Sequence, residues 1–170
     1  MDSQTRFPMM KWLLLTIIVI VLDLWSKSLI SSSMQLYQSI PLIDGFFNFT
    51  LLHNYGAAFS FLADQPGWQR WFFTIISSVM SLVLLIWIMR LKADEKLLAI
   101  ALAFVLGGAI GNLWDRVTLG YVVDFLDVFI VFNDKEQHWP AFNIADSAIF
   151  IGAVLLIIDT FSKPEEVKSA

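Results

Sequence analysis

The sequence contains no cysteine and only two histidines. Without cysteine the chain has no thiol nucleophile, no disulfide and no thiolate ligand for a metal ion. The two histidines, His53 and His138, belong to neither a His-x-x-x-His nor a His-Glu motif, so no metal-ligand cluster is evident. These absences disfavour metal chemistry.

Charged residues are also scarce, and basic residues do not dominate among them. Only 15% of the residues are charged, and the net charge at pH 7 is −4. A protein that binds nucleic acid usually carries a basic excess that neutralises the phosphates. The composition therefore disfavours nucleic acid as a partner.

Hydrophobic residues, in contrast, make up 58% of the sequence, which lies outside the usual balance of a soluble domain. A helix needs about 20 mostly apolar residues to cross a hydrocarbon core about 30 Å thick. Four segments approach that length, so we expect a single membrane-embedded domain over residues 1–170 with four transmembrane helices. The segments are 12–30, 71–89, 97–114 and 141–161.

The first of these segments could be mistaken for a secretory signal peptide, because basic residues precede its apolar run. The run is longer than the apolar region of a signal peptide, and no small-x-small cleavage site follows it. We therefore interpret residues 12–30 as a helix that is retained in the mature protein.

Lysine and arginine in the short connections predict the orientation of the helices. Seven of these residues lie before the first helix, between the second and third, or after the fourth, and four lie on the opposite side. Because the more basic side is usually cytoplasmic, we expect both termini in the cytoplasm and segments 31–70 and 115–140 outside. The seven residues are Arg6, Lys11, Arg90, Lys92, Lys96, Lys163 and Lys168.

The two outward segments are rich in Phe, Val, Ile and Leu, which indicates that they lie on the membrane. Within the first, Asp44 and Gly45 form a turn signal, and residues 46–52 form a run typical of a β-strand. The expected fold is therefore an all-α membrane protein with a small extracytoplasmic β-rich cradle between its first two helices.

Polar residues inside spanning helices cost free energy, so each needs a reason. Asp23 and Lys27 are spaced i, i+4 with the acid first, which favours an ion pair, and we expect this pair to support the structure. Asn112 and Arg116 lie one turn apart near the outward end of the third helix. For these two residues, both helix packing and a functional role remain open.

Asp124 and Asp146 each lie in an apolar run, and both are expected at the outward end of the helices. If they meet in a poorly hydrated site, they cannot both ionise cheaply, so the pair would hold one proton and supply one acid and one base. Hydrolysis of a peptide bond by an aspartic dyad requires this arrangement. The spacing does not show that they meet, so a proton relay and a structural role remain open. Other aspartates, including Asp127, are interpreted as solvated carboxylates without a function.

Five motifs occur along the chain in a fixed order: "DLWSK" from residue 23, "NYGAAFSF" from 54, "GGAIGNLWDR" from 107, "VVDF" from 122 and "FNIADS" from 142. Together they resemble the lipoprotein signal peptidases, the bacterial signal peptidase II family, over about residues 12–161. The resemblance implies an aspartic endopeptidase of the bacterial inner membrane that needs no cofactor. Its activity would remove the signal peptide of a prolipoprotein before the diacylglyceryl-modified cysteine, on the outer face of the membrane.

The resemblance also implies roles for individual residues. Asp124 and Asp146 match the catalytic dyad, and Asp23 and Lys27 match a motif that we interpret as support for the fold. The implied partners are a diacylglyceryl prolipoprotein, membrane lipid and an inhibitor of the globomycin type, and segment 57–62 would cover the site. The residues implied to bind the substrate or the inhibitor are Asn54, Gly56, Asn112, Arg116 and Asn143.

Two other classes of protein remain as alternatives. A small proton-coupled transporter could use Asp124, Asp146 and Asp23 as relay sites, and a non-catalytic assembly protein could use Gly107 and Gly111 to pair helices. Transporters usually show internal repeats or broken helices in matching positions, and neither is evident in this sequence. The peptidase is therefore the favoured prediction.

Overall fold

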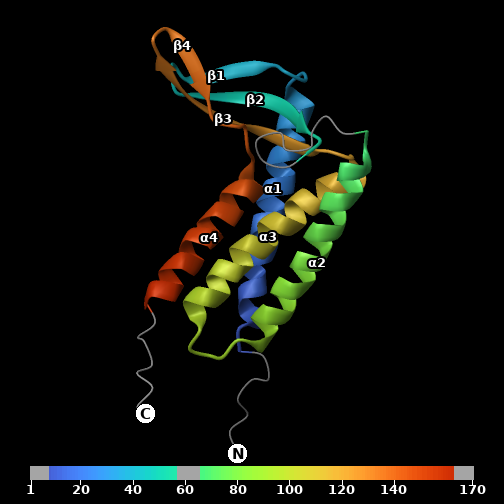
Figure 1. The fold of residues 1–170 in the computed structure, drawn as a ribbon, viewed down its shortest axis with the longest axis vertical. Coiled ribbons are helices and arrows are strands. Elements are labelled where there is room, and N and C mark those ends of the chain that lie inside the picture. Colours follow the sequence, from blue (N-terminus) through green and yellow to red (C-terminus); the bar gives the residue numbers. More distant parts are fainter. Residues whose placement is uncertain (1–7, 57–65, 163–170) are drawn as a thin grey trace, which may run out of the picture.

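The structure, a computed structural model, describes residues 8–56 and 66–162. In this part of the chain four helices are long and apolar enough to cross a membrane, which confirms the four that were predicted (Figure 1). Segment 57–62, predicted to cover the site, lies outside the described residues, as do Arg6, Lys163 and Lys168. The helices are α1 (Leu13–Ser33, preceded by a 3-10 turn at Met10–Trp12), α2 (Trp68–Arg90), α3 (Lys96–Thr118) and α4 (Ile144–Ser162).

Several helix ends differ from those predicted by three or four residues, and two of these bear on the site. The third helix does not stop at residue 114 but continues to Thr118, because no helix-breaking residue occurs before Gly120, whose φ of +90° suits the end of a helix. Asp115 and Arg116 therefore lie inside α3 rather than in an outward segment. The fourth helix begins at Ile144, three residues later than predicted.

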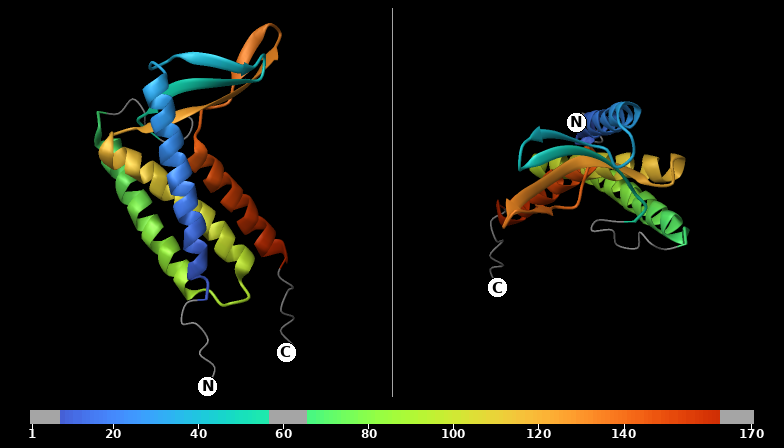
Figure 2. Two further views of the ribbon diagram at one scale, coloured as in Figure 1. Left: turned by 180° about the vertical axis from the view of Figure 1, so that it is seen from behind. Right: turned by 90° about the horizontal axis from the view of Figure 1, so that it is seen from above.

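Helix α3 lies in the middle of the bundle and packs against each of the other three helices (Figures 1 and 2). The beginning of α1, the connection from α2 to α3 and the end of α4 all lie at one end of the bundle, and the sheet lies at the other (Figure 1). The two sets of connections predicted to face opposite sides of the membrane are thus separated by the length of the helices.

Glycines of α3 allow the neighbouring helices to approach closely. A Cβ atom on Gly107 would lie 2.7 Å from the Cβ of Val19 in α1, and one on Gly111 would lie 2.5 Å from Oδ2 of Asp23. A Cβ atom on Gly108 would collide with the carbonyl oxygen of Ala145 in α4. Gly107 and Gly111 thus form a small-xxx-small pair on which α1 packs closely against α3.

A four-stranded antiparallel sheet covers one end of the bundle in the order β1-β2-β3-β4 (Figure 2). The strand expected at residues 46–52 is present as β2, and a turn joins it to β1 at Asp44 and Gly45, as predicted. The expectation of strands only between the first two helices was incomplete, because the second outward segment, rich in Val and Phe, supplies the other two. The strands are β1 (Ser39–Ile43), β2 (Phe47–Asn54), β3 (Val122–Phe132) and β4 (Lys135–His138).

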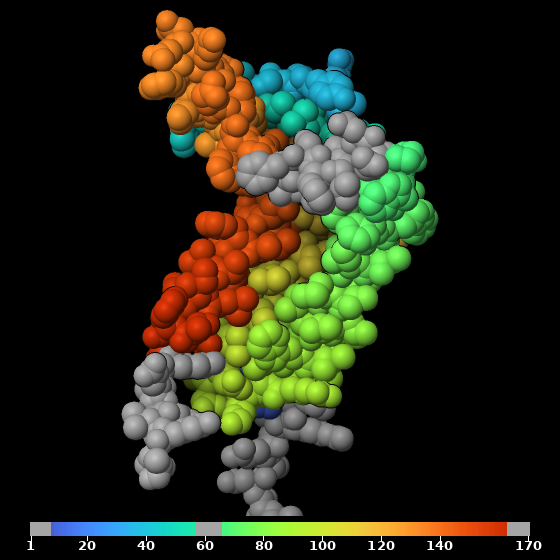
Figure 3. All heavy atoms as spheres, viewed as in Figure 1, coloured from blue at the N-terminus to red at the C-terminus, as the bar shows by residue number. Residues whose placement is uncertain are grey.

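A tight hairpin joins β3 to β4. Asn133 and Asp134 occupy its turn with φ of +51° and +55°, and Phe132 pairs with Lys135 across it. Positive φ at both central residues is characteristic of the type I′ turn, which Asn and Asp tolerate better than other side chains. The hairpin extends beyond the beginning of α4 and overhangs it (Figure 3).

Candidate functional site

Asp146 is held in place by the first turn of α4. Because the helix begins at Ile144, Asn143 occupies the N-cap position, and its Oδ1 accepts the backbone N–H of Asp146 at 2.9 Å. In return, Oδ2 of Asp146 accepts the backbone N–H of Asn143 at 3.3 Å. This reciprocal pair is a capping box, and it places a carboxylate at the positive end of the helix dipole.

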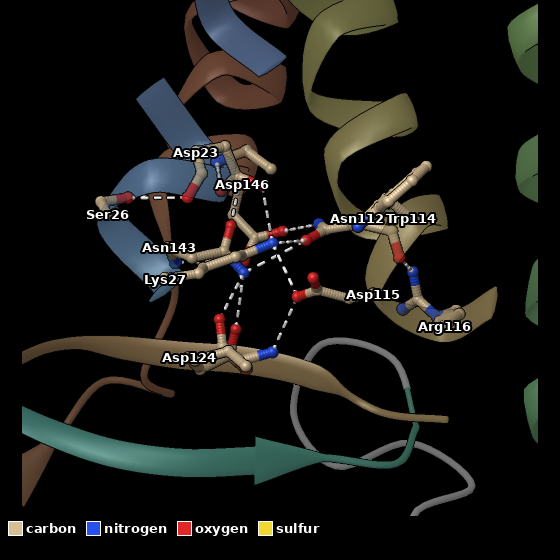
Figure 4. Close-up of polar contacts among 12 residues, drawn as sticks. Asp23, Ser26, Lys27, Asn112, Trp114, Asp115, Arg116, Asp124, Asn143 and Asp146 are labelled. Atoms are coloured by element: carbon tan, nitrogen blue, oxygen red, sulfur yellow. Dashed lines mark hydrogen bonds and ion pairs between the residues drawn. The ribbon is translucent and has the colours of Figure 1, made fainter. Parts of the chain in front are cut away.

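Asp124 approaches the same asparagine from the sheet. It lies in β3 and is only 3% exposed. Its Oδ1 accepts a hydrogen bond from Nδ2 of Asn143 at 2.7 Å (Figure 4). Its Oδ2 accepts one from Nδ2 of Asn54 at 3.0 Å. Asn143 therefore bonds to both Asp124 and Asp146, and it brings the two predicted dyad residues into one site.

The electrostatic environment keeps a proton on the site near neutral pH. Burial, and after it the negative charge of Asp146, raise the pKa of Asp124 from 3.8 to about 7. The hydrogen bonds from Asn54 and Asn143 oppose this shift. A buried carboxyl that titrates near pH 7 beside a second carboxyl can exchange a proton during a reaction, which is the chemistry of a general acid–base pair.

A buried ion cluster lies behind the dyad. Nζ of Lys27 is 2.8 Å from Oδ2 of Asp23, which confirms the predicted pair, and 3.0 Å from Oδ2 of Asp115. It also donates to Oδ1 of Asn112 at 2.9 Å, so each of its three N–H groups has an acceptor. Because Oδ1 of Asn112 faces Lys27, its Nδ2 faces Asp146 and donates to Oδ1 of that residue at 2.7 Å.

The same ion cluster holds the backbone beside each dyad residue. Oδ2 of Asp115 accepts the N–H of Val123, which precedes Asp124, at 3.1 Å. Oδ1 of Asp23 accepts the N–H of Ala145, which precedes Asp146, at 2.9 Å. No role was predicted for Asp115 because it was expected in the outward segment, and its position one residue beyond the apolar run of the third helix was the signal that it needs a partner.

A cavity of about 1320 Å³ opens in front of the two aspartates, both of which line it. Its wall includes three of the five residues predicted to bind substrate, namely Asn54, Asn112 and Arg116. The other two are placed differently: Asn143 is completely buried, and Gly56 contributes its carbonyl oxygen, which accepts Nη2 of Arg116 at 3.2 Å. Apolar side chains of α4 complete one wall of the cavity, among them Ile149, Phe150 and Ile151.

Asp127 lines this cavity as well, and its interpretation as a solvated carboxylate was wrong. It is 6% exposed. The backbone N–H groups of Phe125 and Leu126 both donate to the carbonyl oxygen of Phe142, at 3.0 and 2.8 Å, so β3 bulges there. Asp127 follows Asp124 by three positions, an offset that would place the two side chains on opposite faces of a regular strand, but the bulge lets both face the cavity.

The partners of Asp127 come from the neighbouring strands. Nδ1 of His138 lies 2.7 Å from Oδ1 of Asp127, and Oγ1 of Thr50 donates to Oδ2 at 2.9 Å. The hydrogen bond to Asp127 raises the pKa of His138 above its ordinary range. Sequence reasoning missed this pair because its members come together only through the pairing of β3 with β4.

Metal ligands do not gather at the site. Within residues 8–56 and 66–162, no group of three or more His, Asp and Glu side chains is arranged to hold a metal ion. The carboxylates of the site instead accept hydrogen bonds from asparagine side chains, a lysine and the backbone.

Comparisons with known proteins agree on one family. A family model described as signal peptidase (SPase) II matches residues 15–162. The chain is 53% identical over 157 residues to a lipoprotein signal peptidase of Alteromonas mediterranea, covering 92% of this chain and 84% of that protein. It is 50% identical over 170 residues to the one of Ectopseudomonas mendocina, covering 100% and 99% of the two chains. A bacterial membrane enzyme solved by the in meso method at 2.3 Å resolution superposes with a TM-score of 0.75 at 32% identity, covering 93% of this chain and 94% of the other.

Proposed function

Because the chain belongs to the signal peptidase II family and is thus a membrane protease, we propose that it removes signal peptides from diacylglyceryl-modified prolipoproteins. The cut would fall before the lipidated cysteine. One observation carries this proposal: Asp124 and Asp146 both bond to Asn143 and both line a cavity that has an apolar wall. The names of the similar proteins, lipoprotein signal peptidases, support the choice of substrate.

In the proposed mechanism Asp124 holds the proton and Asp146 is ionised. Asp146 takes a proton from a water molecule as the water oxygen attacks the carbonyl carbon of the scissile peptide bond. Asp124 gives its proton to the carbonyl oxygen, which produces a tetrahedral diol. As the carbon–nitrogen bond breaks, Asp146 passes the proton that it took from water to the leaving amine nitrogen, and Asp124 regains a proton from a hydroxyl of the diol. The assignment is supported by the pKa of Asp124 and by the hydrogen bonds that Asp146 accepts from Asn112 and the backbone of Asn143.

The other polar residues would position the substrate or the dyad. Asn54, Asn112 and Arg116 line the cavity, so their N–H groups can pair with the backbone of an extended substrate or of a globomycin-type inhibitor. Asn143 is buried behind the carboxyl groups, so we assign it to positioning the dyad rather than to substrate contact. The acyl chains of the substrate would lie along the apolar wall of α4, and the substrate would enter sideways from the lipid.

The proposed location is the inner membrane of a bacterium, with both termini in the cytoplasm and the sheet on the outer face. The excess of lysine and arginine at one end of the bundle supports this orientation. The dyad lies between the sheet and the adjoining ends of α3 and α4, which is where the cleavage site of a membrane-anchored precursor would be presented.

An assay in detergent separates the peptidase from the alternative of a proton-coupled transporter. We expect the purified protein to cleave a peptide that carries a diacylglyceryl cysteine, with no ion gradient and no added cofactor. A peptide of the same sequence without the lipid is the matched control, and we expect it to be cleaved much more slowly. If the lipidated peptide stays intact while the protein remains folded, the proposed function is wrong.

The rate of cleavage is expected to fall as the pH rises through about 7, the pKa of Asp124. Below that pH Asp124 carries the proton that the mechanism uses, and above it both carboxyl groups are ionised and no acid remains. The measurement is kcat against pH at saturating lipidated peptide, with the melting temperature followed at each pH. Because the two carboxyls interact, the observed pKa belongs to the pair. A kcat that instead rises through pH 7 would make Asp124 the base.

A further inference from the structure

A second polar cluster lies in the wall of the cavity, on the sheet rather than on the helices. It consists of Thr50 from β2, Asp127 from β3 and His138 from β4, all of which line the same cavity as the dyad. Asp127 is buried and has both oxygens occupied, one by Thr50 and one by His138. The mechanism proposed for the dyad uses none of these three residues.

The ring of His138 is held in a defined orientation. It stacks on Phe129, with the ring centroids 4.9 Å apart and the planes 21° from parallel. Nδ1 lies 2.7 Å from Oδ1 of Asp127, and Nε2 lies 3.2 Å from Oε2 of Glu136. Carboxylate oxygens only accept hydrogen bonds, so Asp127 and Glu136 together favour the charged form of the ring, in which both nitrogens carry a hydrogen.

The two carboxylates that contact His138 differ in their environment. The side chain of Asp127 is 9% exposed, whereas that of Glu136 is 58% exposed and that of His138 is 41% exposed. An exposed ion pair contributes little to stability, so Glu136 can leave Nε2 at small cost. Asp127 thus fixes the orientation of the ring. A ligand in the cavity can replace Glu136 as the acceptor of the hydrogen bond from Nε2–H.

We propose that Nε2–H of His138 donates a hydrogen bond to a carbonyl oxygen of the bound lipidated substrate, with Asp127 as the residue that positions the ring. The inference rests on the proposed function and extends the substrate site from the helices onto the sheet. A carbonyl oxygen that enters a poorly hydrated cavity loses its hydrogen bonds to water and needs a donor there. The apolar wall of α4 offers no donor, and the donors of Asn54 and Asn112 lie beside the dyad, where they bond to Asp124 and Asp146. His138 therefore adds a donor on the sheet, at the part of the cavity that β4 lines.

Variants of His138 test the donor. His138→Phe keeps a ring that can stack on Phe129 but removes both N–H groups, and we expect it to raise KM about tenfold with kcat within about twofold of the unchanged protein. His138→Gln restores an N–H near the position of Nε2, and we expect its KM to stay within about threefold. Lys135→Ala, an exposed change on the same strand, is the control and should alter neither constant.

Glu136→Ala provides a second test that leaves the ring of His138 intact. Since Glu136 competes with the substrate for Nε2–H, its removal should lower KM by about twofold without changing kcat or the melting temperature. An equal KM for His138→Phe and the unchanged protein would overturn the proposal. A loss of kcat in His138→Phe that matches a loss of folded protein would also overturn it, because a purely structural role predicts that result.

Two substrates distinguish the possible sources of the carbonyl oxygen, which are the ester groups of the lipid and the peptide that follows the cysteine. One substrate carries two alkyl chains in ether linkage and so lacks the ester carbonyl groups. With it, the KM difference between the unchanged protein and His138→Phe should vanish if an ester carbonyl is the acceptor. With a peptide truncated after the lipidated cysteine, this KM difference should vanish if the acceptor is a peptide carbonyl. A difference that persists with both substrates would refute the proposed contact. Failure of the unchanged protein to cleave any lipidated peptide would instead refute the proposed function.

Discussion

Replacing Asp124 or Asp146 with asparagine is expected to reduce cleavage of a lipidated peptide by about a thousandfold or more, while the protein still folds and inserts into the membrane. An amide has nearly the size of a carboxyl group but can neither release nor accept the proton that the reaction needs. Each carboxyl accepts a hydrogen bond on both of its oxygens, and the single amide oxygen of asparagine can keep one of the two, which is enough to hold a side chain of the same shape in place. The measurement is kcat of each variant, with size-exclusion profile and melting temperature as checks on folding.

The stability of Asp124→Asn gives an independent check on the environment of this carboxyl. Its pKa is raised from 3.8 to about 7, so between these values the folded protein binds more protons than the unfolded one. Stability therefore falls as the pH rises through this range, and an asparagine removes that loss. We expect the variant to melt at the same temperature as the unchanged protein or higher at pH 8. Asp44→Asn, in the exposed β1–β2 turn, is the matched control and should leave rate and stability unchanged.

Appreciable cleavage by Asp124→Asn or Asp146→Asn would refute the proposal that these two residues form the catalytic dyad.

The sequence predicted the helices well because length and hydropathy are properties of a segment by itself. It predicted their ends less well, because ends depend on particular local contacts. The start of α4 is set by the capping box of Asn143 and Asp146, and the end of α3 by the backbone conformation of Gly120. The sheet was predicted only in part, because β3 pairs with β2 across about 70 residues of sequence, and strand pairing over such a distance is not encoded locally.

The candidate site shows the same division between local and distant information. Four charged residues of the site could be predicted because a charge inside an apolar run costs free energy and therefore indicates a function or a partner. They are Asp23, Lys27, Asp124 and Asp146. That both dyad residues bond to Asn143 could not be read from spacing, since it depends on how β3 folds back against the start of α4. The site of Asp127 was missed for a comparable reason. A one-residue bulge in β3 moves the side chain of Asp127 to the opposite face of the strand. Such a bulge cannot be predicted from the alternation of apolar and polar residues along the sequence.

Lys27→Met is expected to cause the largest loss of stability of any single substitution considered. The side chain of Lys27 is 3% exposed, and its removal would leave Asp23 and Asp115 as buried carboxylates without a cation. Breaking a buried ion pair by removing one partner costs about 3–5 kcal/mol, because the remaining charge is uncompensated. For a chain of this size we expect the melting temperature to fall on the order of 10 °C. Lys92→Met, in the exposed connection from α2 to α3, is the control and should change it little.

A neutral version of the same cluster separates its contribution to stability from its contribution to catalysis. In the triple variant Asp23→Asn, Lys27→Met, Asp115→Asn no charge is left unpaired, and the asparagine oxygens can still accept the N–H groups of the backbone beside the dyad. We therefore expect most of the lost stability to return. Cleavage should nevertheless stay about tenfold to a hundredfold slower, because Asn112 no longer receives a hydrogen bond from Lys27 and holds Asp146 less well. If the triple variant regains full activity together with its stability, Lys27 serves the fold alone, and if neither returns, the charges of the cluster are not the source of the loss.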